Sequence, residues 1–65
     1  MTAAVQHAER AVALKPGDAT ARDLLGVTLA AQGRRDLAAL QFREALRLDP
    51  ADDTARMHLE QVLGQ

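Results

Sequence analysis

The sequence predicts an all-α protein of one small domain. Alanine and leucine, the strongest helix formers, supply fourteen and ten of the 65 residues, whereas Phe42 is the single aromatic residue. Two prolines and a central glycine then divide the chain into segments of helical length. Strand-like alternation of apolar and polar residues is absent.

The turns between the expected helices are marked by residues that stop or start a helix. Pro16 and Pro50 each interrupt a helical pattern, and Gly33 stands where a left-handed C-terminal cap is usual. Asp18 and Asp52 follow the prolines and can cap the next helix, because their carboxylates accept bonds from free backbone N–H groups. We therefore expect four helices, at about 2–14, 19–32, 35–48 and 53–63.

Each of the last three expected helices carries one apolar stripe at the helical period of 3.6 residues. In the second helix Ala21, Leu25 and Leu29 share one face with the polar residues Thr28 and Gln32. The stripe of the third helix comprises Leu37, Ala38, Phe42, Ala45, Leu46 and Leu48, and that of the fourth Ala55, Leu59, Val62 and Leu63. We expect these stripes to face the core.

The chain repeats itself at an offset of 34 residues. Ten of the 31 pairs compared at this offset are identical: Ala4/Ala38, Ala11/Ala45, Leu14/Leu48, Pro16/Pro50, Asp18/Asp52, Thr20/Thr54, Ala21/Ala55, Arg22/Arg56, Leu25/Leu59 and Leu29/Leu63. Alanine richness alone cannot produce the proline, aspartate, threonine and arginine pairs. The matches fall on turns, caps and expected core positions, as an internal structural repeat requires.

A helix–turn–helix period of 34 residues resembles the tetratricopeptide repeat. The family's small and large positions match at Leu25-Gly26, Leu29, Gly33, Ala38, Phe42, Ala45 and Leu48-Asp49-Pro50. The resemblance implies that Phe42 packs between Leu25, Leu29 and the Gly26 backbone. Arg22 and Arg56 depart from the family, because they occupy the place of a frequent tryptophan.

The resemblance also divides the chain, taken as a single domain over 1–65. One complete repeat covers 19–52. Residues 2–16 resemble the second helix of a preceding repeat, and residues 53–63 resemble the first helix of a following one.

Composition and motifs argue against catalysis. Cysteine and serine are absent, neither His7 nor His58 has a carboxylate at helical contact spacing, and no acidic cluster has metal-ligand spacing. We interpret both histidines as ordinary helix-surface residues and expect no enzyme activity, cofactor or metal. The absence of a signal peptide, of cysteine and of an apolar run approaching about 18 residues indicates a soluble, cytoplasmic protein that does not enter a membrane.

The charged residues have a structural interpretation. Asp18–Arg22, Asp52–Arg56 and Arg56–Glu60 are spaced for ion pairs one helical turn apart. A DNA-binding helix–turn–helix is a minor alternative, based on four arginines, Arg34, Arg35, Arg43 and Arg47. The net charge of −1 and the acidic residues Asp36 and Glu44 in the same segment disfavour nucleic acid as a partner.

The family resemblance implies a protein or peptide partner bound on the concave side that the first helix of each repeat forms. The residues expected on that side are Thr20, Asp23, Leu24, Val27, Ala31, Thr54, Met57, His58 and Gln61. A carboxylate clamp of the kind found in some family members is not supported, because Asp23, Leu24 and Val27 occupy its places. Two alternatives stay open: Leu24 and Val27 merely cover a neighbouring helix, or uncovered terminal helices make the chain associate with itself as a homodimer.

Overall fold

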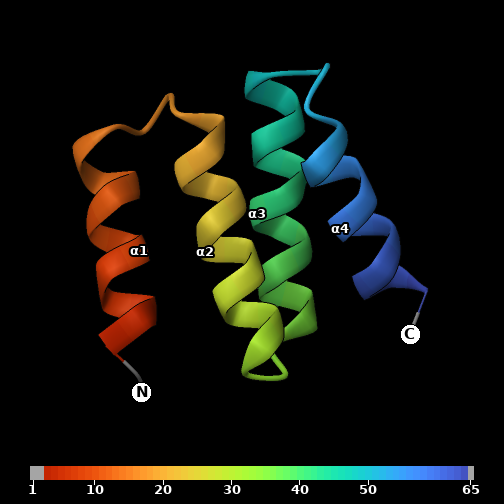
Figure 1. Cartoon of the computed structure of the whole chain (residues 1–65), viewed down its shortest axis with the longest axis horizontal. Helices are drawn as coiled ribbons and strands as arrows, with labels where there is room; N and C mark the ends of the chain where they lie inside the picture. The colour runs from red at the N-terminus through yellow and green to blue at the C-terminus, as the bar shows by residue number, and fades with distance from the viewer. Residues whose placement is uncertain (1–2, 65) are drawn as a thin grey trace.

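Four helices follow one another in the computed structural model, which describes residues 3–64 (Figure 1). They are α1 (Ala3–Leu14), α2 (Ala19–Ala31), α3 (Arg35–Leu48) and α4 (Asp53–Leu63), and no strand occurs within the described range. The all-α prediction is confirmed. The expected bounds differ only at Gln32, which caps α2 instead of belonging to it, and at residue 2, which lies outside the described residues.

Local capping explains where the helices begin and end. The carboxylate of Asp18 accepts a bond from the Thr20 amide at 2.9 Å, and that of Asp52 accepts one from the Ala55 amide at 3.0 Å. Gly33 adopts a φ of +80°, a conformation that favours glycine, and its amide donates to the Ala30 carbonyl. The turn residues chosen from the sequence therefore serve as predicted.

The three expected ion pairs on these helices do not form within the described part of the chain. Arg22 instead donates to the Gln41 side chain on α3, and Arg56 contacts Asp53 and the Pro50 carbonyl. The prediction of Asp18–Arg22, Asp52–Arg56 and Arg56–Glu60 pairs was therefore wrong. Asp18 and Asp52 turn back to their own helix ends because uncapped amides there need acceptors.

Neighbouring helices run antiparallel and pack in chain order (Figure 1). α1 lies on α2, α2 on α3 and α3 on α4, while α2 and α4 make a smaller contact with each other. α4 inclines away from α3 toward its C-terminal end, so that the two helices are closest near the turn that joins them (Figure 1). The first helices of successive repeats, α2 and α4, are therefore neighbours across α3.

The core is built around Phe42 on α3. Its ring belongs to one buried cluster with Val5, Ala8, Leu25, Leu29 and Ala38. Gly26 allows the close approach of α2 and α3, because a Cβ at this position would lie 2.5 Å from the Phe42 Cε1 atom. The predicted packing of Phe42 against Leu25, Leu29 and Gly26 is confirmed.

The buried stripes differ from expectation at several positions. Leu37 and Leu63 are exposed, whereas Ala39, which was not expected in the stripe, is buried. α3 thus buries Ala39 beside the expected Ala38, Phe42 and Ala45, because it contacts both α2 and α4. Val5 and Ala8 of the terminal helix α1 are buried, since α1 lies directly on α2.

Candidate functional site on α2 and α4

The predicted partner-binding residues lie on α2 and α4, and most of them are exposed. Leu24, Val27 and Met57 expose 53%, 41% and 52% of their surface. The exposed polar or small members of the set are Thr20, Ala31, Thr54 and Gln61. Neighbouring helices therefore cover Leu24 and Val27 only in part.

Asp23 and His58 behave differently from the rest of the set. Asp23 is buried, and its Oδ1 lies 3.3 Å from Nδ1 of the half-buried His58. The His58 ring also packs on Phe42, with the ring centroids 5.3 Å apart. The interpretation of His58 as an ordinary surface residue was wrong, because this side chain joins α4 to both α2 and α3. His7 is exposed, as expected.

A hollow of about 170 Å³ opens beside this contact, between the C-terminal halves of α2 and α4. The Phe42 ring of α3 lines it together with residues of the two flanking helices: Val27, Ala30, His58, Gln61 and Val62. Sequence reasoning found Val27, His58 and Gln61 but missed Ala30, Phe42 and Val62. These three carry the signature of core residues, and only the spacing between α2 and α4 shows that they also border a surface opening.

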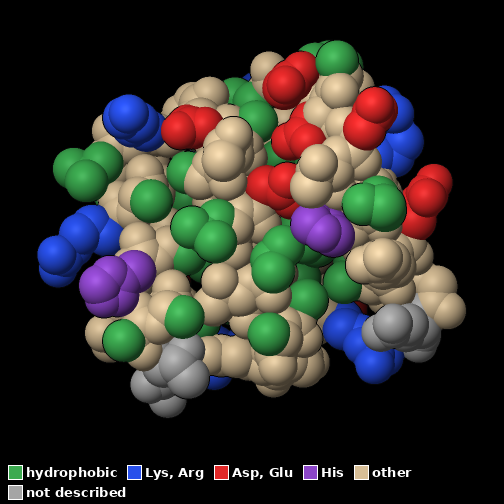
Figure 2. Space-filling model, in the orientation of Figure 1, with side chains coloured by type: hydrophobic (Ala, Val, Ile, Leu, Met, Phe, Trp, Pro, Cys, Tyr) green, Lys and Arg blue, Asp and Glu red, His purple; other side chains and the backbone are tan. Residues whose placement is uncertain are grey.

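Acidic side chains gather toward the starts of α2 and α4, at the other end of these helices from the hollow. In Figure 2 most of the visible acidic side chains lie in the upper half of the face, where Figure 1 shows α2 and α4 beginning, and most Lys and Arg side chains lie toward the edges. The aspartates at the starts of these helices and in the turns before them are Asp18, Asp23, Asp49, Asp52 and Asp53. Arg56 offsets one of these charges through its contact with Asp53 at 3.0 Å.

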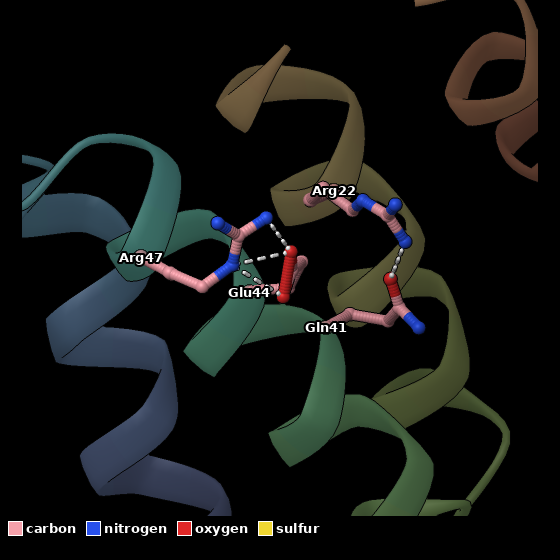
Figure 3. Close-up of polar contacts among 4 residues, drawn as sticks. All are labelled: Arg22, Gln41, Glu44 and Arg47. Atoms are coloured by element: carbon pink, nitrogen blue, oxygen red, sulfur yellow. Dashed lines mark hydrogen bonds and ion pairs between the residues drawn. The ribbon is translucent and has the colours of Figure 1, made fainter. Parts of the chain in front are cut away.

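A second polar cluster joins α2 to α3 (Figure 3). Nη1 of Arg22 donates to Oε1 of Gln41 at 3.2 Å, and Arg47 forms an ion pair with Glu44. The hydrogen bond from Arg47 lowers the pKa of Glu44, with smaller contributions from the charges of Arg47 and Arg22. Any stability from this lowered pKa is present at neutral pH and lost in acid, and it is small because the pair is exposed. We interpret this cluster as structural support.

The described residues contain no group of three or more His, Asp or Glu side chains that could hold a metal ion. None of the described helices is long and apolar enough to cross a membrane.

The helical hairpin of α2 and α3, flanked by the single helices α1 and α4, defines a helical-repeat protein. A comparison with protein families agrees: the family described as tetratricopeptide repeat matches residues 19–52, more than half of the chain. The chain therefore belongs to the tetratricopeptide-repeat family. Such repeats are typically non-catalytic modules for protein–protein interaction. Neither the curated proteins nor the solved structures gave a match.

Proposed function

We propose that this chain is a non-catalytic module that presents the face formed by α2 and α4 to a peptide or protein partner. The supporting observation is the exposure of Leu24, Val27 and Met57 on the two helices that flank the hollow. Exposed apolar groups that gather on one face are typical of interaction sites. In this proposal residues 1–65 act as one unit, with the complete repeat at 19–52 between two half repeats.

Peptide binding on this face can be mapped by NMR. Peptides selected from a random library against the 65-residue chain are expected to shift the amide signals of Thr20, Val27, Met57 and Gln61. Affinity should fall only a few-fold between low and high salt, because few charges meet at the contact. Binding that leaves all of these signals unmoved would contradict the proposal.

The same titration distinguishes the nucleic-acid alternative. A DNA duplex should cause no shifts at low micromolar concentration. Shifts confined to the four arginines Arg34, Arg35, Arg43 and Arg47, with an affinity that collapses as salt rises, would favour a helix–turn–helix function instead.

Self-association is a second candidate function, favoured by unequal burial of equivalent positions in the repeat. Leu29 on α2 exposes 6% of its surface, whereas its equivalent Leu63 on α4 exposes 58%. α3 is the second helix of the complete repeat and covers part of α2. α1 resembles a second helix of this kind in sequence. In this second proposal α1 of one copy covers α4 of another, or two like ends meet around a two-fold axis, which gives a closed dimer.

Sedimentation equilibrium tests this second candidate. The wild-type chain should approach a dimer as its concentration rises toward the millimolar range. Leu63→Glu should keep the chain monomeric, because a charge cannot be buried in the contact without a partner. Leu40→Glu is the matched control, since Leu40 is equally exposed but lies on α3. A mass of 7.0 kDa at every concentration would exclude self-association.

A further inference from the structure

We infer that the hollow between α2 and α4 binds one apolar side chain of a partner peptide that carries Lys or Arg about four residues away. This inference rests on the proposed function and specifies the chemistry of the partner. The hollow, the polar groups at its edge and the charges beyond it each contribute one part of the specificity.

The size of the hollow selects a single side chain. Its volume of about 170 Å³ is well below the roughly 300–1,000 Å³ of sites that enclose small-molecule ligands. Val27, Ala30, Val62 and the Phe42 ring give it mainly apolar walls. An aliphatic or aromatic side chain inserted here removes its own surface and that of the walls from water, which is the main source of affinity for such an anchor.

The edge of the hollow is suited to a peptide backbone. Gln61 is exposed, and its amide can both donate and accept a hydrogen bond. His58 is held by Asp23 on one side and by the Phe42 ring on another, so its position at the edge is fixed. A fixed edge reduces the ordering cost of binding.

The acidic side chains near the start of α4 indicate where the basic residue of the partner should lie. The acidic helix starts lie toward one end of the face, and Asp53 on α4 precedes Gln61 by eight residues, or about 12 Å along a helix. An extended peptide advances about 3.3 Å per residue, so about four residues span this distance. A Lys or Arg there lies toward Asp49 and Asp52, which form no ion pair within the described residues, whereas an acidic residue would be repelled.

The test selects peptides from a random phage library against the whole 65-residue chain and measures their affinity by fluorescence anisotropy. Selected sequences should share one Leu, Ile, Met or Phe with Lys or Arg about four positions away. Replacing the apolar anchor of a selected peptide with alanine should weaken binding at least about tenfold. Replacing its basic residue with glutamate should weaken binding several-fold, because an exposed attraction becomes a repulsion.

A protein variant locates the anchor. Ala30→Leu fills the hollow and should weaken the same peptides at least about tenfold. Ala13→Leu makes the same change at an exposed position of α1 and should leave affinity unchanged. The peptide substitutions keep the inference testable even if Ala30→Leu fails to fold.

The outcomes separate the inference from the function on which it rests. Failure to select any peptide contradicts both. Peptides that shift α2 and α4 signals but tolerate both the loss of the anchor and a filled hollow contradict the inference alone. Selected peptides with an acidic residue in place of Lys or Arg overturn its charge component.

Discussion

Replacing Phe42 with alanine is expected to leave the chain largely unfolded at room temperature. The side chain is 1% exposed and belongs to the cluster that joins α1, α2 and α3. Removing a buried phenylalanine costs about 3–5 kcal/mol. A protein of 65 residues has a total stability of only about 3–10 kcal/mol at the usual 0.05–0.15 kcal/mol per residue. The loss is therefore comparable to the total free energy of unfolding of the chain.

Thermal unfolding followed by circular dichroism measures this effect. Leu40→Ala is the control, because Leu40 lies on the same helix but is 54% exposed, so its truncation should change stability by no more than about 0.5 kcal/mol. A Phe42→Ala chain that melts cooperatively at the wild-type midpoint would contradict the packing of Phe42 between α1, α2 and α3.

The helices and their central contact could be predicted because local signals agree with the fold. Pro16, Gly33 and Pro50 mark the turns, and Asp18 and Asp52 satisfy backbone amides that any helix start leaves free. The Phe42 contact could be predicted for a different reason. The resemblance to the tetratricopeptide repeat implied that Phe42 packs against Leu25, Leu29 and the Gly26 backbone.

The contact between Asp23 and His58 could not be predicted, because it depends on how α4 is rotated and inclined against α2. The two residues are 35 positions apart and belong to different helices. Helical spacing shows which residues share a face of one helix, but it does not show which faces of two helices meet. The same limit explains why the exposure of Leu37 and the burial of Ala39 were not predicted. Both depend on α3 contacting α2 and α4 at once.

Phe42 links stability to the proposed binding site, because the ring that fills the core also lines the hollow. Its position depends on α2 and α3 lying close together at Gly26. A change at Gly26 therefore tests the geometry of the core and the floor of the hollow together, while leaving the exposed residues of the face intact.

Gly26→Ala is expected to destabilise the chain although alanine is the better helix former. The new Cβ would lie 2.5–2.8 Å from three atoms of the Phe42 ring, so this buried ring would have to leave its place in the core. Overpacking of this kind costs about 1–3 kcal/mol, against a gain of about 1 kcal/mol in helix propensity. Gly17→Ala is the matched control, because nothing lies within 4 Å of a Cβ there, and this variant should be neutral or slightly more stable.

The physical cause can be isolated with a double-mutant cycle in urea. Phe42→Leu weakens the core, but it removes the ring atoms that the Gly26→Ala methyl group would meet. In the Phe42→Leu background Gly26→Ala should therefore become neutral or stabilising, since only the gain in helix propensity is left. An equal cost of Gly26→Ala in both backgrounds would mean that the methyl group meets something other than the ring. The close approach of α2 and α3 at Phe42 would then be wrong.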